Sequence, residues 1–243
     1  MIELKDFSMG FGERKLLNDV SVSFPTKKLT ALIGRNGTGK STLMKAVCGL
    51  NKNYDGEILI NGENLRQIPV KRLSKIIAYV NTMRPRLANL RCRDVVELGR
   101  TPYTSWHGKI SKSDKEVVKE AFNLVGMTEY EDRYFTSLSD GESQKIMIAR
   151  AIAQDTNIIL LDEPTSFLDL PTRYDLAVFL QNLVRKNGKT ILFSTHELDI
   201  ALNFCDYIAL IDAEKVTVLP SSEMKNSKQL KEAFPKLDLH LGL

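Results

Sequence analysis

The segment LTALIGRNGTGKSTLMKAVCGL constrains the fold of this chain more than any other. It matches the pattern G-x-x-x-x-G-K-[S/T] through Gly34, Gly39, Lys40 and Ser41. The apolar run at residues 29–33 predicts a strand, and residues 41–48 predict a helix. Glycines between a strand and a helix let backbone N–H groups approach phosphate oxygens at the helix N-terminus. The motif therefore predicts an α/β fold with a phosphate-binding loop.

Each residue type in this loop suits a nucleoside triphosphate. We expect Lys40 to reach the β- and γ-phosphates as a catalytic cation and Ser41 to ligate Mg²⁺. A glycine-rich turn with a solvated lysine is the alternative interpretation, which the flanking strand and helix disfavour. The predicted nucleotide-binding residues of the loop are Gly34, Arg35, Asn36, Gly37, Thr38, Gly39, Lys40, Ser41 and Thr42.

Two further apolar runs, NIILLDEP and KTILFSTHE, end in polar residues, as is typical of buried parallel strands. The first ends at Asp162 and Glu163. We predict that Asp162 holds Mg²⁺ and that Glu163 orients or deprotonates the attacking water. The second ends at His196, whose imidazole can donate a hydrogen bond to a γ-phosphate. A lone histidine is more often structural, but this one follows a strand predicted to end at the same site.

Composition excludes several classes of protein. The chain has 243 residues, 43% of them hydrophobic and 26% charged, which fits one large globular domain or two small ones. A net charge of +4 without a basic run longer than two residues argues against a strong nucleic-acid binder. Three scattered cysteines indicate neither a zinc site nor a disulfide framework, and favour a reducing cytoplasm. We find no secretory signal and no apolar window long enough to span a membrane.

Local patterns predict other elements. Short apolar runs at the N-terminus and the dipeptide Asn61-Gly62 indicate antiparallel strands with a hairpin. The segment SDKEVVKEAFNLVGM predicts a helix with Ser113 as N-cap, Glu116 completing a capping box, and Gly126 as its left-handed end. The residues from Ser221 onward give no structural prediction.

With the segment LSDGESQK at residues 138–145, these motifs resemble the ATP-binding cassette family, whose signature is Leu-Ser-Gly-Gly-Gln. Leu138, Ser139 and Gly141 match three of its five positions. Asp140 replaces a glycine, and we expect its side chain to face solvent or to cap the helix. Phe11 falls where the family has an aromatic residue that stacks on adenine. Residues 166–169, SFLD, fall at the family's dimer-contacting D-loop and bring Asp169 to the nucleotide.

The resemblance implies an α/β fold, a P-loop NTPase core with an N-terminal antiparallel β subdomain and an inserted α-helical subdomain. It implies one cassette over residues 1–243, with its core at about 1–82 and 151–220, helical subdomain at about 83–150 and a tail at 221–243. It also implies a head-to-tail dimer, in which Ser139 and the backbone N–H of Gly141 hold the γ-phosphate of ATP bound to the other copy.

A motif in the middle of the chain indicates which branch of the family the chain resembles. Residues 96–103, VELGRTPY, followed by Trp106-His107-Gly108, are similar to a motif in ATPases of iron-siderophore, haem and cobalamin importers. The alternative is that these aromatics and the arginine only pack the helical subdomain. The importer branch implies ATP and Mg²⁺ as cofactors, transmembrane permease subunits, indirectly a substrate-binding protein, no nucleic acid, and a peripheral position on the cytoplasmic face of the cell membrane.

Three other classes of protein are alternatives to an importer ATPase. An exporter or lipid-trafficking ATPase would share the motifs, and so would a non-transport cassette ATPase of DNA repair or translation. A non-transport protein of that kind usually has a long coiled-coil insertion or two cassettes. A P-loop kinase is disfavoured, since a transfer enzyme needs no signature in trans.

One position departs from the family. The predicted strand in IIAYVNT ends at Asn81-Thr82, and the family has a glutamine at the position of Thr82 that reaches Mg²⁺ and the attacking water. Thr82 has a short hydroxyl stem and could ligate Mg²⁺ only through a water. We favour a loop that couples subdomains without a direct ligand; the alternative is that Asn81 bulges into the site.

Overall fold

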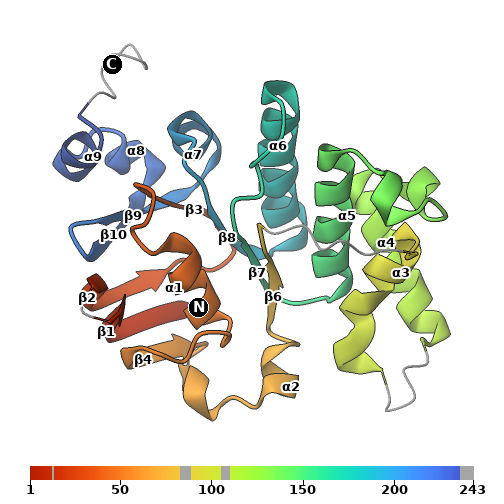
Figure 1. Cartoon of the computed structure of the whole chain (residues 1–243), viewed down its shortest axis with the longest axis horizontal. Helices are drawn as coiled ribbons and strands as arrows, with labels where there is room; N and C mark the ends of the chain where they lie inside the picture. Colours follow the sequence, from red (N-terminus) through yellow and green to blue (C-terminus); the bar gives the residue numbers. More distant parts are fainter. Residues whose placement is uncertain (13, 83–88, 105–109, 236–243) are drawn as a thin grey trace.

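The computed structural model describes residues 1–12, 14–82, 89–104 and 110–235, except for the side chain of Phe11. The predicted motif Trp106-His107-Gly108 lies outside these residues. In the described part of the chain, two sheets stand beside a group of helices (Figure 1). None of the described helices is long and apolar enough to cross a membrane.

The N-terminal sheet is antiparallel, with strand order β2-β1-β4-β5. Its hairpin is the predicted one: Asn61 and Gly62 both have positive φ, 53° and 84°, between paired strands β4 and β5. Such a pair of left-handed residues matches the twist of a two-residue hairpin turn. The strands of this sheet are β1 (Ile2–Phe11), β2 (Arg14–Phe24), β4 (Asp55–Ile60) and β5 (Glu63–Asn64).

The second sheet has the order β10-β9-β3-β8-β7-β6, and all its pairs except β10 with β9 are parallel. The two apolar runs predicted as parallel strands are the adjacent β7 and β8, and every residue in both strands is buried. The strands are β3 (Leu29–Gly34), β6 (Ile77–Val80), β7 (Ile158–Leu161), β8 (Thr190–Ser194), β9 (Tyr207–Asp212) and β10 (Lys215–Pro220).

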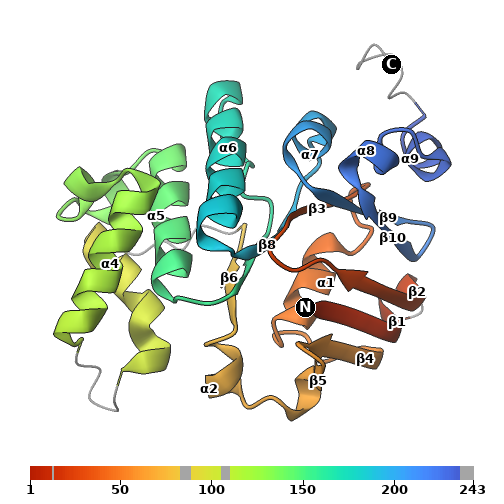
Figure 2. The same cartoon turned by 180° about the vertical axis from the view of Figure 1, so that it is seen from behind.

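Helices cover the sheets and form a separate group. Helices α3, α4 and α5 lie together at the end of the molecule away from β1 and β2, as both views show (Figures 1 and 2). The α-helices are α1 (Lys40–Val47), α2 (Val70–Leu73), α3 (Cys92–Glu97), α4 (Lys112–Val125), α5 (Asp140–Ala153), α6 (Leu170–Asn187), α7 (Leu198–Phe204), α8 (Ser221–Met224) and α9 (Lys228–Ala233). The 3₁₀ turns in the described part of the chain are η1 (Leu65–Gln67), η2 (Leu98–Tyr103), η3 (Thr128–Tyr130) and η4 (Phe135–Ser137).

The predicted start of α4 was wrong. The helix is capped by Ser111, whose Oγ accepts a hydrogen bond from the N–H of Asp114 at 3.1 Å, while the Asp114 carboxylate accepts one from the N–H of Ser111. Ser113 and Glu116 have the same spacing and would form an equivalent box. The capping box of Ser111 and Asp114 forms instead, because the Asp114 carboxylate also has a buried partner in Arg100. The predicted end at Gly126 is confirmed by its φ of 68°.

Arg100 links three elements of the helical group. Its Nε lies 2.8 Å from Asp114 Oδ1 and its Nη1 donates to the carbonyl of Ala153 at 2.7 Å. The side chains of Arg100 and Asp114 are 8% and 10% exposed. Hydrogen bonds from Ser111, followed by those from Arg100, hold the pKa of Asp114 below its usual value. The arginine of the VELGRTPY motif therefore joins η2 to the start of α4 and the end of α5.

Removing this arginine should destabilise the protein. Arg100→Met leaves the buried Asp114 without its cationic partner, which costs about 3 kcal/mol in free energy of unfolding. Urea denaturation measures that loss.

A matched control is Arg93→Met, which breaks an exposed arginine–aspartate pair with Asp132 in the same group of helices. Exposed pairs contribute less than about 1 kcal/mol, so the control should remain close to the wild-type stability. Equal losses in the two variants would contradict a specific role for the buried pair.

Candidate functional site

The phosphate-binding loop connects β3 to α1 and borders a depression of about 560 Å³. Gly34 has a φ of 155°, and a Cβ there would lie 2.7 Å from the carbonyl oxygen of Ile211. Glycine is therefore required where the chain leaves the sheet. The residues lining the depression are Arg14, Leu16, Asn36, Gly37, Gly39, Lys40, Ser41, Thr42 and Glu163.

Lys40 is held inside the loop. Its Nζ donates to the carbonyl oxygens of Gly34 at 2.8 Å and Arg35 at 3.3 Å. Burial lowers the pKa of Lys40, while the nearby carboxylates of Glu163 and Asp162 oppose that shift. The ammonium is thus fixed by main-chain acceptors at the edge of the depression, where it can meet a phosphate group.

The carboxylate of Asp162, directly after β7, accepts hydrogen bonds from hydroxyl groups on three elements. Ser41 Oγ and Ser194 Oγ donate to its Oδ1 at 2.9 and 2.7 Å, and the hydroxyl of Tyr79 donates to Oδ2 at 3.3 Å. Burial, with the Asp162 carboxylate as the next cause, raises the pKa of Tyr79. The structure therefore brings together Ser41 and Asp162, two of the residues predicted to hold a metal ion.

The donor set of Ser41 and Asp162 fits Mg²⁺. This ion prefers oxygen ligands, takes few of them from the protein and completes its shell with water and phosphate oxygens. Within the described residues, no group of three or more His, Cys, Asp and Glu side chains could hold a metal. A serine hydroxyl and a carboxylate beside a phosphate loop are oxygen ligands of the kind that Mg²⁺ takes from a protein.

Glu163 lines the same depression as Lys40 and Ser41. It has a φ of 47°, an uncommon conformation for a residue with a side chain. Its N–H donates to Ser194 Oγ at 2.8 Å, and its carboxylate accepts a hydrogen bond from Ser166 Oγ at 3.0 Å. These bonds fix the turn that separates the buried Asp162 from the accessible Glu163, so the neighbouring carboxylates can take different roles.

His196 follows β8, the neighbour of β7, and its side chain is 52% exposed. It is outside the set of residues that line the depression. The next residue, Glu197, is 9% exposed and pairs with Arg173 of α6 at 2.8 Å. The chain beside His196 is therefore fixed to α6, while the imidazole itself is accessible to a ligand.

Thr82 lies beside Asp162 and makes a contact that the sequence did not indicate. Its Oγ1 donates to the main-chain carbonyl of Asp162 at 2.9 Å. The hydroxyl therefore ties the end of β6 to the end of β7. Residues 83–88, which continue this loop, are outside the described residues.

The signature residues lie far from the phosphate loop of the same chain. Both views show the start of α5 and the start of α1 in separate parts of the molecule, with α6 between them (Figures 1 and 2). Ser139 is the N-cap of α5 and forms a capping box with Glu142. Asp140 is exposed in the first turn, as predicted, and Gly141 follows it. These residues therefore do not line the depression at the phosphate loop of their own chain.

Asp169 is the N-cap of α6, and its Oδ1 accepts a hydrogen bond from the N–H of Thr172 at 3.2 Å. Phe167 and Leu170 on either side of it are 72% and 60% exposed. The loop around Asp169 therefore exposes two large apolar side chains. Phe11, the residue predicted to stack on adenine, has its side chain outside the described residues.

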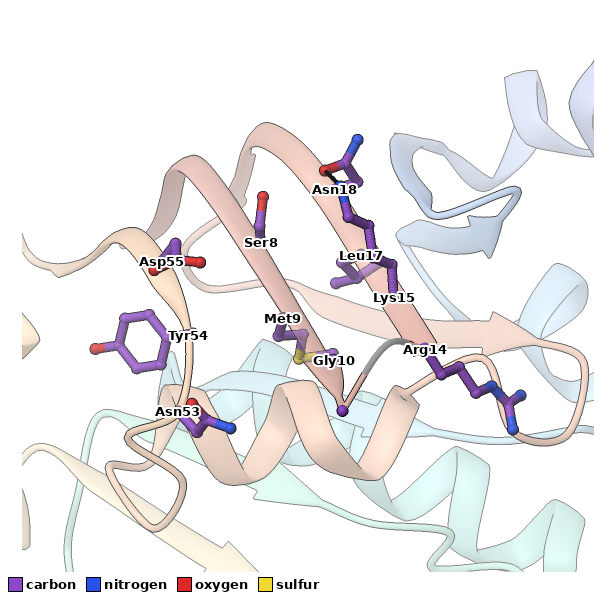
Figure 3. Close-up of a pocket in the computed structure, with 11 residues that line it drawn as sticks. Ser8, Met9, Gly10, Arg14, Lys15, Leu17, Asn18, Asn53, Tyr54 and Asp55 are labelled. Carbon is purple, nitrogen blue, oxygen red and sulfur yellow. Dashed lines mark hydrogen bonds between the residues drawn. The ribbon is translucent and has the colours of Figure 1, made fainter.

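Sequence reasoning missed Arg14, Ser194 and Tyr79. Arg14 Nη2 donates to the carbonyl of Gly37 at 3.1 Å, so a cation from β2 borders the loop. Figure 3 shows a second depression, of about 350 Å³, which Arg14 also lines. No motif indicates Arg14, because its position depends on the pairing of β1 with β2. For Tyr79 the sequence does contain a signal: a tyrosine, with its polar hydroxyl group, within the short apolar run that forms β6.

Comparisons with known proteins agree with this geometry. The family described as ABC transporter matches residues 17–166. An uncharacterized ABC transporter ATP-binding protein of Methanocaldococcus jannaschii is 35% identical over 93% of this chain and 78% of its own length. The iron(3+)-hydroxamate import ATP-binding protein FhuC of Bacillus subtilis is 33% identical over 96% of this chain and 87% of its own length.

Solved structures agree as well. A metal-chelate type ABC transporter in an inward-facing conformation matches with a TM-score of 0.84 and 26% identity, over 96% of this chain and 88% of its own. A bacterial ABC transporter cassette solved as a dimer, MJ0796, matches with a TM-score of 0.79 and 25% identity, over 91% of this chain and 99% of its own. The predicted α/β P-loop NTPase fold with an antiparallel β subdomain is thus confirmed. This chain belongs to the ABC transporter family, as one of its ATP-binding, ATP-hydrolysing cassettes.

Proposed function

We propose that this chain is the ATPase subunit of an importer for an iron-siderophore, haem or cobalamin-type substrate. Support comes from similar proteins: FhuC of Bacillus subtilis is named as an iron(3+)-hydroxamate import protein, and one of the similar solved structures is described as a metal-chelate type ABC transporter. The observation that carries the hydrolytic role is the cluster in which Ser41 and Asp162 meet beside Lys40 and Glu163.

In this proposal the phosphate loop, residues 34–42, binds the triphosphate with its N–H groups and with the Lys40 ammonium. Ser41 and Asp162 would hold Mg²⁺, which neutralises charge on the phosphates when bound. Glu163 takes the proton of the attacking water, since it is the carboxylate that the depression reaches. His196 donates a hydrogen bond to the γ-phosphate.

Two copies would complete two sites. Ser139 and the N–H of Gly141 hold the γ-phosphate of ATP on the other copy, at the start of α5. Asp169, with the exposed Phe167 and Leu170, contacts the partner beside it. ATP closes this two-fold interface, and loss of the γ-phosphate reopens it.

Thr82 has a coupling role rather than a direct one in this account. Because its hydroxyl is bonded to the carbonyl of Asp162, the loop that starts there is attached to the metal-binding strand. The closing motion of the dimer would pass through this loop to permease subunits docked between the core, at about 1–82 and 151–220, and the helical subdomain, at about 83–150. The chain would then be peripheral on the cytoplasmic face of the cell membrane, with a substrate-binding protein as an indirect partner.

Co-purification tests the importer assignment. We expect the tagged chain, isolated from detergent-solubilised membranes of its source, to carry a permease of many spans, and the assembled complex to gain ATPase activity with a substrate-binding protein. Recovery with nucleic acid or ribosomes, and without a membrane protein, would contradict import.

Glu163→Gln tests the general base. The amide keeps the shape of the side chain but accepts no proton, so turnover should fall by at least about 100-fold while ATP binding is retained. Phosphate release measures turnover, and equilibrium dialysis measures binding.

Lys40→Ala is the companion variant, since it should lose ATP affinity itself. Normal turnover by Glu163→Gln would exclude Glu163 as the base and leave the phosphate loop intact as a binding site.

Thr82→Gln tests the departure at the end of β6. If the loop works by coupling, the longer amide should change the ATPase rate of the isolated chain by less than about threefold, because Glu163, Asp162, Ser41 and His196 already form a hydrolytic set. A gain of tenfold or more would instead mean that a missing amide limits the chemistry.

A further inference from the structure

The side chain of Arg35 leaves the phosphate loop and contacts the C-terminal tail. Its Nε donates to the carbonyl oxygen of Ala233 at 3.0 Å, across 198 positions of sequence. Ala233 is the last residue of α9, where helix carbonyls lack partners within the helix and where a cation is favourable. A residue that the sequence assigns to nucleotide binding therefore has a partner in the segment that gave no prediction.

Helix α9 is a fixed support for this contact. Leu230 and Ala233 are 0% and 2% exposed and belong to the same hydrophobic cluster as Ile33, which directly precedes the phosphate loop. Ser227 caps the helix by accepting a hydrogen bond from the N–H of Leu230 at 3.1 Å. The helix packs against β9, the neighbour of β3 in the sheet. Its last carbonyl is thus held at a constant place beside the end of β3.

The main chain of Arg35 organises the loop. Its carbonyl oxygen accepts hydrogen bonds from Thr38 Oγ1 at 2.9 Å and from Lys40 Nζ at 3.3 Å. One residue therefore joins the tail, through its side chain, to the catalytic lysine, through its main chain. A shift of Arg35 would move an acceptor of Lys40 and the turn stabilised by Thr38.

We propose that Arg35 is a positioning residue, which uses α9 as an anchor to hold the phosphate loop in its nucleotide-binding conformation. The inference rests on the proposed function, since it assigns the tail a part in nucleotide affinity. The anchor acts on the loop before nucleotide binds, so its main effect is to lower the Kd for nucleotide. In this account the tail is a structural part of the ATP site and not a dispensable extension.

The first test compares Arg35→Met and Arg35→Lys. Methionine keeps the apolar stem without a donor, so the Kd for Mg²⁺–ADP should rise about three- to tenfold, the range for one hydrogen bond. ADP is the probe because it lacks the γ-phosphate that the second copy would contact. The KM for ATP should rise by a similar factor, and kcat should fall by a smaller factor than the KM rises. Lysine keeps a donor and should recover part of the affinity.

A double-mutant cycle separates anchoring from direct contact with nucleotide. Removing residues 228–243 should raise the Kd for ADP, and Arg35→Met in that shortened chain should add less than about twofold. If Arg35 bound nucleotide itself, the two changes would multiply, and that outcome would overturn the proposal. Lys228→Met is the matched control on α9. It removes an exposed cation whose only ion pair among the described residues is with Glu232, four positions later on the same helix.

Hydrogen exchange supplies a readout that does not require the shortened chain to fold. Thermodynamic linkage is reciprocal, so ADP should slow amide exchange in residues 228–234 of the wild-type chain, and Arg35→Met should abolish that protection. An unchanged Kd for Arg35→Met, or equal ADP protection in both chains, would overturn this inference alone. A wild-type chain that binds no nucleotide would overturn the proposed function as well.

Discussion

A buried carboxylate holds the site together. Asp162 is 2% exposed, and burial of a charge without partners is costly. Its partners come from α1, β6 and β8 as Ser41, Tyr79 and Ser194, so the oxygen that can take a metal ion also fixes the elements around it. Ser41 is a partner of Asp162 and directly follows Lys40 in α1. The position of the phosphate loop relative to the end of β7 is therefore fixed.

Strand β6, which carries Tyr79, connects the site to α5, the helix that follows the signature residue Ser139. Near the end of α5, Arg150 donates to the carbonyl of Tyr79 at 3.1 Å, and Gln154 donates to the carbonyls of Ser74 and Ile77. Burial lowers the pKa of Arg150. Helix α5, which Ser139 caps at its N-terminus, is therefore attached at its other end to β6, the strand whose Tyr79 contacts Asp162. These bonds physically connect the predicted signature with Asp162, the aspartate that we propose as a metal ligand.

The sequence was sufficient where local patterns decide the structure. The phosphate loop, the hairpin at Asn61-Gly62 and the buried strands β7 and β8 follow from glycine spacing and apolar runs. It was insufficient where a distant partner decides. Ser111 caps α4 because Asp114 meets Arg100, Arg14 borders the loop because β1 pairs with β2, and α9 is ordered because Leu230 enters a core built by other elements. Thr82 bonds to a carbonyl whose position only the parallel pairing of β6 with β7 sets.

A crystal structure of the chain with the substitution Glu163→Gln, grown with ATP and Mg²⁺, tests the central claim most directly. The account predicts Ser41 Oγ and an Asp162 oxygen in the coordination sphere of the ion, directly or through one water, with Ser139 of a second copy at the γ-phosphate. An ion held away from both Ser41 and Asp162, or a γ-phosphate bound without any contribution from a second copy, would contradict it.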